Sequence, residues 1–338
     1  MRTDRPLTTG ELRIFRIATL LTVITIALGS MVCATDSSSA CPAWPACYDD
    51  QVGPQVQRGW LENPAIEFIH RAISFACLVF LGWAGWLGRR HTDARLRVLP
   101  WVALACAIGS AVFGMMIILF TLPLGLALLD LGFAFVAMVL IVIATQAGAG
   151  LATADGEPKV RNLAGATVVT LIVMHLLGAL VAGKTESGWA SFTRCVSWPM
   201  WDILDVDRWP LLQGVRIGLA VLAIGMIAGA FALSLRRRHL RGPAWTLVGL
   251  LAVEVVLGAF IRTQGITAGQ TNGIVAPLAV AYAVTAVGVL WAAAWLLGRA
   301  MPTAARRCPE DDKTPPVVEP GASRALAVSR PRAMPPGA

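Results

Sequence analysis

Long apolar runs separated by short polar segments dominate the pattern of the chain. About 20 apolar residues in a helix cross the hydrocarbon core of a bilayer. Because backbone polar groups in hydrocarbon must be satisfied within their own segment, each run is predicted to be a helix. The predicted spans are 14–34, 64–87, 99–120, 124–147, 162–183, 209–235, 243–262 and 273–297. The pattern therefore predicts an all-α integral membrane protein with eight transmembrane helices.

Composition excludes a water-soluble domain. The chain is 56% hydrophobic and 14% charged, with a mean hydropathy of +0.67, whereas a soluble domain has about 25% charged residues. The sequence has no glycine-rich phosphate loop, Ser/His/Asp set or zinc-ligand spacing, so the chemistry of soluble enzymes is not expected.

Basic residues predict how the chain is oriented. With both termini cytoplasmic, the inside segments hold most of the 28 Lys and Arg residues, and the outside loops hold only Arg58, Lys184, Arg194 and Arg208. This positive-inside pattern predicts a multi-pass plasma-membrane protein. The net charge of +8 is thus a topology signal, and no nucleic-acid partner is expected. Residues 1–13 form the predicted cytoplasmic N-terminus, ahead of a first span interpreted as a mature helix, and residues 298–338 a disordered cytoplasmic tail.

Two halves of the chain repeat each other. A Ser/Thr-rich stretch follows Gly29 and another follows Gly178, and each leads to a Cys and a Trp-Pro pair, 44–45 and 198–199. Further on, "VFGMMI" (112–117) matches "VLGAFI" (256–261). Residues 14–150 and 162–297 are therefore predicted to be tandem four-helix bundles related by a pseudo-twofold axis along the membrane normal. Each bundle is expected to be able to hold a cofactor between its helices.

The stretch "NPAIEFIHRAI" (63–73) places three ionisable residues at the start of the second span. His70 is a candidate ligand of haem iron, and Glu67, three residues earlier, lies on the same helix face. The alternative is that Glu67 and Arg71, at i and i+4, only neutralise each other. The second copy has Gln213 and Arg216 at the positions aligned with Glu67 and His70.

Three other features invite a functional interpretation. Asp130, alone in a long uncharged stretch, needs a partner inside the membrane, and His70, Arg71 or Arg216 could serve. His175 is expected to make a helix-packing hydrogen bond. Cys41 and Cys47 in "CPAWPAC" lie outside, where a disulfide can persist, with a structural or a redox role. Their pairing stays open because Cys33 and Cys195 lie near the same face.

The combination of "CPAWPAC" with "EFIHR" resembles the heme A synthase family, over about residues 14–297. The resemblance implies an oxidoreductase that converts a methyl group of haem O to the aldehyde of haem A for cytochrome oxidase. It implies that His70 binds the haem iron in the first half, that Glu67 is the catalytic carboxylate, and that Cys41 and Cys47 form a disulfide. Arg71 and Asp130 complete the predicted cofactor-binding residues. The implied partners are haem O, a haem O synthase, oxidase assembly factors and membrane lipid.

The chain also departs from the family pattern. Histidines expected in helices 4, 6 and 8 are replaced by Asp130, by Arg216 and by a residue at or near Pro277. This inventory excludes a bis-histidine haem b in the second half. Three hypotheses follow: a divergent synthase with a five-coordinate or water-ligated haem, a non-catalytic haem-binding or oxidase-assembly paralogue, and a structural subunit of a respiratory complex. A further hypothesis makes His175 a replacement ligand at the interface between the two copies.

Overall fold

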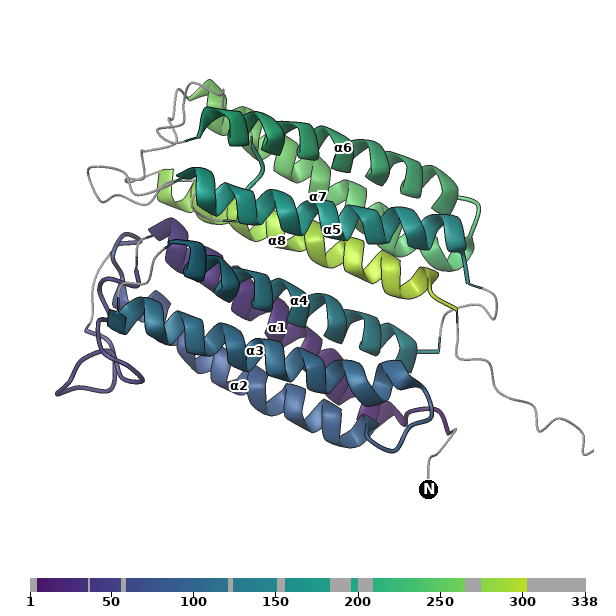
Figure 1. The fold of residues 1–338 in the computed structure, drawn as a ribbon, viewed down its shortest axis with the longest axis horizontal. Helices are drawn as coiled ribbons and strands as arrows, with labels where there is room; N and C mark the ends of the chain where they lie inside the picture. The colour runs from purple at the N-terminus through teal and green to yellow at the C-terminus, as the bar shows by residue number, and fades with distance from the viewer. Residues whose placement is uncertain are drawn as a thin grey trace, which may run out of the picture. The chain divides into compact units, whose positions relative to one another are not determined.

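The chain folds into long helices only, over the part that the structure describes. The computed structural model describes residues 5–35, 37–55, 59–120, 124–150, 156–182, 196–199, 209–264 and 275–302. In these ranges it contains eight helices, and all are long and apolar enough to cross a membrane (Figure 1). They are α1 (Thr9–Thr35), α2 (Pro64–Gly88), α3 (Ala94–Phe120), α4 (Leu124–Gly148), α5 (Pro158–Ala182), α6 (Pro210–Ser234), α7 (Arg238–Thr263) and α8 (Val275–Ala300). The all-helical, multi-pass prediction is confirmed, while the predicted tail lies almost entirely outside the described residues.

The start of α2 is defined by local sequence. Asn63 adopts an extended conformation, and its side-chain oxygen accepts a 3.0 Å hydrogen bond from the backbone N–H of Ala65. Pro64 occupies the first helical position, where its missing N–H would have had no intrahelical partner. This cap fixes where the helix begins, and so it places Glu67 in the first turn and His70 in the second.

The helices pack as two groups. Helices α1 to α4 pack against one another, α5 to α8 do the same, and α8 contacts both α1 and α4. Gln146 of α4 links the groups, because its side-chain oxygen accepts hydrogen bonds from Trp295 (3.1 Å) and Arg299 (2.7 Å) of α8. These contacts are consistent with the tandem bundles, and both belong to one compact unit. The exact domain boundaries stay a prediction.

The two bundles are filled differently. We call the end where α1, α3, α5 and α7 begin the inner end. The buried core cluster of the first bundle, from Phe15 and Ala18 to Ile141 and Ala144, lies entirely in the inner half of its helices. The other cluster extends along the whole length of the second bundle, from Val160 to Trp198 and Tyr282 near the outer end, and it also includes Ile26, Ala34 and Phe135 of α1 and α4. Among the described residues, the core cluster that belongs to the first bundle alone does not extend into its outer half.

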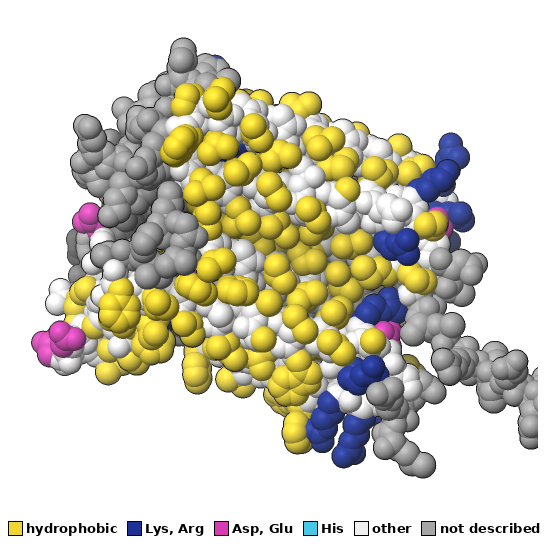
Figure 2. All heavy atoms as spheres, in the orientation of Figure 1, with side chains coloured by type: hydrophobic (Ala, Val, Ile, Leu, Met, Phe, Trp, Pro, Cys, Tyr) yellow, Lys and Arg dark blue, Asp and Glu magenta, His cyan; other side chains and the backbone are white. Residues whose placement is uncertain are grey.

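The surface matches a membrane-spanning chain. Hydrophobic side chains cover the visible face of the described residues, and Lys and Arg gather at the inner end (Figure 2). Large apolar side chains such as Phe75, Leu211 and Val256 are mostly exposed, as lipid-facing residues would be. This distribution agrees with the positive-inside pattern, while the membrane and the side on which the termini lie stay predictions.

Candidate functional site

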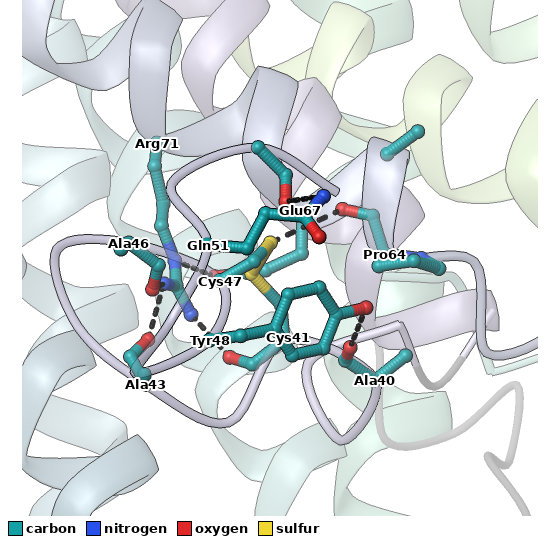
Figure 3. Close-up of a disulfide and its surroundings, with 12 residues drawn as sticks. Ala40, Cys41, Ala43, Ala46, Cys47, Tyr48, Gln51, Pro64, Glu67 and Arg71 are labelled. Atoms are coloured by element: carbon teal, nitrogen blue, oxygen red, sulfur yellow. Dashed lines mark hydrogen bonds and ion pairs between the residues drawn. A yellow bond between two sulfur atoms is a disulfide. The ribbon is translucent and has the colours of Figure 1, made fainter. Parts of the chain in front are cut away.

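Arg71 connects the start of α2 to the loop that follows α1. Its Nε donates a 2.8 Å hydrogen bond to Oε1 of Glu67, so the ion pair expected at i and i+4 is present. The rest of the guanidinium donates to three backbone oxygens of the loop (Figure 3): those of Ala43 (2.6 Å), Ala46 (2.9 Å) and Cys41 (2.7 Å). Both side chains are largely buried. Arg71 therefore holds the loop and one carboxylate oxygen at the same time.

A disulfide closes this loop. Cys41 is bonded to Cys47 rather than to Cys33, and both cysteines are completely buried. The backbone N–H of Ala43 donates to the carbonyl of Cys47 at 3.1 Å, and the hydroxyl of Tyr48 donates to the carbonyl of Ala40 at 3.2 Å (Figure 3). The loop is thus compact, and its carbonyls at Cys41, Ala43 and Ala46 accept hydrogen bonds from Arg71. This geometry supports the structural role of the disulfide.

His70 lies against α1 where that helix has a glycine. A Cβ at Gly29 would lie 3.2 Å from Cε1 and 3.7 Å from Nε2 of His70, so the glycine makes room for the imidazole. The backbone of Thr25 lies close to the ring. Its Nδ1 is buried and has no hydrogen-bond partner among the described residues. A neutral imidazole that keeps one nitrogen unpartnered suits a ligand of haem iron.

Asp130 has a different partner from those expected. Its Oδ1 accepts a hydrogen bond from the hydroxyl of Ser110 on α3, and its Oδ2 lies near Gly114, where a Cβ would be 3.6 Å away. The expectation that His70, Arg71 or Arg216 would be the hydrogen-bonding partner is therefore wrong. The physical reason is that Arg71 and Arg216 are committed to other oxygens, while a serine hydroxyl one helix away can donate to the carboxylate.

The second bundle contains an arginine in place of the site histidine. Arg216 is completely buried; its Nε donates to the carbonyl of Met174 at 3.1 Å and its Nη2 donates to the carbonyl of Ser197. A Cβ at Gly178 would lie 2.6 Å from Nη2. Near it, the hydroxyl of Tyr282 donates to the carbonyl of Trp198 at 2.9 Å. The guanidinium and its neighbours fill the region equivalent to the site in the first bundle.

His175 is completely buried between the bundles. Its ring centroid lies 5.8 Å from that of Phe135 on α4. Neither ring nitrogen has a hydrogen bond of normal geometry among the described residues, although the backbone of Ser197 is close. The expected helix-packing hydrogen bond is therefore not present among the described residues, and the histidine packs against an aromatic ring instead.

A haem needs fewer protein ligands than a bare iron ion. Within the described ranges, no group of three or more His, Cys, Asp or Glu side chains could hold a bare metal ion. Haem supplies four of its own nitrogen ligands, so a single unpartnered histidine nitrogen is enough for the iron. His70 offers such a nitrogen in the outer half of the first bundle, beyond the core cluster of that bundle. The second bundle offers Arg216, which cannot be a ligand because it keeps its proton.

The first bundle matches a known family. Residues 2–142 match the model of the COX15-CtaA family, described as cytochrome oxidase assembly protein. This match confirms the family resemblance and supports a role in cytochrome oxidase assembly. The matched residues include the disulfide loop, Glu67, His70 and Asp130, whereas the second bundle lies beyond them. No curated protein matches the chain.

Some residues of these sites were not identified from the sequence. In the sequence, Gly29 and Gly178 stand out only as the starts of the repeated stretches. Their role in making room for His70 and Arg216 follows from the contacts between helices. Ser110 is uncharged, so nothing in the sequence distinguishes it as the partner of Asp130. Glu254, an acid inside an apolar run, is buried in α7; its charge within a predicted span was a signal that could have found it.

Proposed function

We propose that this protein acts in cytochrome oxidase assembly by oxidising a methyl group of haem O to the aldehyde of haem A, in the outer half of the first bundle. The observation that carries the proposal is the buried, unpartnered Nδ1 of His70, one turn from the buried carboxylate of Glu67. Both lie on α2 in the outer half of the first bundle, beyond the core cluster of that bundle. The match to oxidase assembly proteins over the same residues supports it.

His70 would hold the iron of the substrate haem. Gly29 leaves room for the imidazole, whose Cε1 edge is nearest to α1, and the backbone of Thr25 lies close to the ring. Packing that restricts the ring to one orientation would strengthen metal binding. When bound, the haem supplies the redox chemistry. Asp130, held by Ser110 on the opposite side of the bundle, is the proposed polar contact where the family has a histidine.

Glu67 would act on the carbon that is oxidised. Because Arg71 binds Oε1, the carboxylate is fixed in position and its negative charge is balanced. A fixed carboxylate in a site shielded from water can stabilise positive charge that develops on the methyl carbon, or take up a proton from it. The disulfide loop, held by the other donors of Arg71, would cover the site. Arg71 is thus a positioning residue, whereas Glu67 is the catalytic one.

Conversion of the methyl group to the aldehyde takes one oxygen atom from water and releases four electrons and four protons, and the electrons would leave to an external redox protein or other electron acceptor. In the family pattern, a second haem held by two histidines receives them, and here the corresponding region contains Arg216, Trp198 and Tyr282. We further propose that the protein is in the plasma membrane with both termini cytoplasmic, which places the site near the outer face. A haem O synthase that delivers the substrate and oxidase assembly factors that take the product are the proposed partners.

The product of the reaction tests this proposal. The wild-type protein is produced in cells that contain haem O but no other source of haem A, and extracted haems are identified by mass. We expect haem A with the wild type and with Glu62→Gln, a control in the exposed turn before α2. We expect bound haem O without haem A for Glu67→Gln. Haem A formed by the Glu67→Gln variant would contradict the catalytic role.

A non-catalytic haem-binding or oxidase-assembly role is the second candidate. The observation that favours it is the filling of the second bundle by Arg216, which removes the usual route for electrons. In the same experiment this role predicts haem O bound to the wild type with no haem A formed. A structural subunit of a respiratory complex predicts a wild-type protein without haem.

A further inference from the structure

Two arginines from different bundles lie close together at the inner end. Arg299 is partly buried in the last turn of α8, and Arg16 is exposed on α1, a helix that α8 contacts. Their positive charges lie within electrostatic reach of each other, and like charges at short range repel. The helix dipole favours a cation at the end of α8, but it does not favour one near the start of α1. The pair therefore calls for a negative counter-charge.

No acid in the described ranges supplies that charge. Each acid that the structure describes at the inner end already forms an ion pair with another arginine, at 2.8 Å or less. The pairs are Glu11–Arg5, Asp93–Arg95 and Glu157–Arg237. Neither Arg16 nor Arg299 forms an ion pair with a described residue. An anion from outside the chain can therefore balance the two charges.

Arg299 is held in a way that leaves part of its guanidinium accessible. Its Nε donates a 2.7 Å hydrogen bond to Gln146 of α4, and its Cζ lies 6.0 Å from the ring centroid of Trp295, one turn earlier. Gln146 is itself fixed by the 3.1 Å hydrogen bond from the indole of Trp295. The nitrogens Nη1 and Nη2 of Arg299 make no hydrogen bond with a described residue, and they are not buried. Two such nitrogens match the spacing of two phosphate oxygens.

Apolar side chains continue from the two arginines toward the middle of the membrane. Trp291, Trp295 and Arg299 follow one another at intervals of four on one face of α8, and the two indoles stack with ring centroids 5.4 Å apart. Helix α1 runs in the opposite direction, so the residue one turn farther in from Arg16 is Leu20, which is 58% exposed. Tryptophan is typical of the depth at which lipid head groups meet hydrocarbon. We call these five residues the α1–α8 seam.

We infer that the α1–α8 seam binds an anionic phospholipid through its phosphate. The phosphate would accept hydrogen bonds from Nη1 and Nη2 of Arg299 and from the guanidinium of Arg16, which is exposed and can turn toward the same group. Leu20 and the indoles would contact the acyl chains. A basic pocket between transmembrane helices is a known type of site for anionic head groups. Because the arginines belong to different bundles, the bound lipid would join the bundles at the inner end.

The charge of the pair predicts which lipid binds. Phosphatidylglycerol has one negative charge and no positive one. Phosphatidylcholine has the same phosphate, but its ammonium group would lie near two guanidinium groups, and like charges repel. The seam is therefore expected to prefer phosphatidylglycerol. This preference is independent of haem, since the seam lies at the end of the molecule opposite to His70.

A matched set of variants tests the seam. Arg16→Gln and Arg299→Gln each remove one of its charges, and Arg236→Gln removes an exposed arginine from the turn between α6 and α7. Delipidated full-length protein in a neutral detergent is titrated with dioleoylphosphatidylglycerol or dioleoylphosphatidylcholine, and bound lipid is counted by native mass spectrometry. We expect the wild type and Arg236→Gln to bind one phosphatidylglycerol about tenfold more tightly than phosphatidylcholine. Arg16→Gln and Arg299→Gln should lose most of this preference.

Two further measurements keep the test decisive. Arg16 makes no hydrogen bond with a described residue, so Arg16→Gln should unfold at the wild-type midpoint and its lipid binding can be compared directly. Excess inorganic phosphate should not displace the lipid, because the acyl chains bury apolar surface that the free ion lacks. Displacement by inorganic phosphate would overturn the assignment of a lipid. Equal affinity of the wild type for both lipids, or an unchanged preference in Arg16→Gln, would overturn the inference as well.

Discussion

The guanidinium of Arg216 lies in the second bundle where the imidazole of His70 lies in the first. Each side chain contacts a glycine on the preceding helix of its own bundle, Gly178 for Arg216 and Gly29 for His70. The nitrogen Nδ1 of His70 is left without a partner, whereas Arg216 donates to backbone carbonyls. One half of the repeat thus keeps a metal-ligand nitrogen, and the other half has become a packed polar core.

Substituting the two glycines by alanine is predicted to lower the stability of the fold by different amounts. In Gly178→Ala the new Cβ would lie 2.6 Å from Nη2 of Arg216, and the guanidinium cannot retreat without losing its carbonyl partners. We expect a loss of about 1–3 kcal/mol in stability, seen as a lower thermal unfolding midpoint. In Gly29→Ala the Cβ would lie 3.2 Å from Cε1 of His70, which requires a smaller shift and costs less. Equal midpoints for the two variants would show that Arg216 is not fixed as described.

Replacing Arg71 should release the disulfide loop. Arg71→Met removes the partner of a buried carboxylate and the donors to three loop carbonyls. Breaking a buried ion pair costs about 3–5 kcal/mol, so we expect a lower unfolding midpoint and faster proteolysis within residues 41–47. Arg71→Lys keeps the charge but not the fork of donors, and should give an intermediate result. The exposed Arg13→Met serves as control. Proteolysis at the wild-type rate in Arg71→Met would rule out this role of the arginine.

Asp93, at the inner end, is predicted to make a pH-dependent contribution to the stability of the fold. Burial alone would raise the pKa of its carboxyl, but hydrogen bonds from the side chain and the backbone of Arg95 hold the pKa below its usual value. A pKa that is lower in the folded state adds stability above the ordinary pKa, and this stability is lost as the pH falls through the folded value. Arg95 also donates to the carbonyl of Pro302 at 2.8 Å, which links this turn to the end of α8.

The corresponding variant is Asp93→Asn, which keeps an acceptor for the first turn of α3. At neutral pH we expect it to be less stable than the wild type by about 1 kcal/mol. The difference should disappear in acid, below the folded pKa of Asp93, where the wild-type carboxyl is also neutral. Unfolding midpoints of both proteins are compared across that range. A difference that persists unchanged in acid would mean that the charge of Asp93 does not contribute.

The apolar pattern was sufficient to predict the helices, but not their inner ends. All eight predicted spans coincide with helices, yet α3 begins at Ala94 and α7 at Arg238, about one turn before the apolar run. Hydropathy detects only residues that must be in hydrocarbon. Arginines at the inner end can continue the helix while their long side chains reach the polar boundary, so charge pattern alone does not mark where the helix begins.

The site was predictable where a motif joins residues close in sequence. Glu67, His70 and Arg71 lie on consecutive turns of one helix, and the Glu67–Arg71 pair follows from their spacing. The partner of Asp130 was not predictable, because Ser110 is on another helix and a hydroxyl is not unusual in a span. Glu254 is marked in the sequence only by its charge within a predicted span, and the groups that surround it are known only from the folded chain.

The amount of haem bound per chain tests the central claim most directly. Protein produced with ample haem is purified in detergent, and its haem content and optical spectrum are measured for the wild type, His70→Ala and His175→Ala. The account predicts one haem per wild-type chain, held in the first bundle. His175→Ala should bind the same amount with unchanged axial-ligand bands. His70→Ala should bind none, although its unfolding midpoint is unchanged. Full haem content in His70→Ala would contradict the claim that the first bundle holds haem through this histidine.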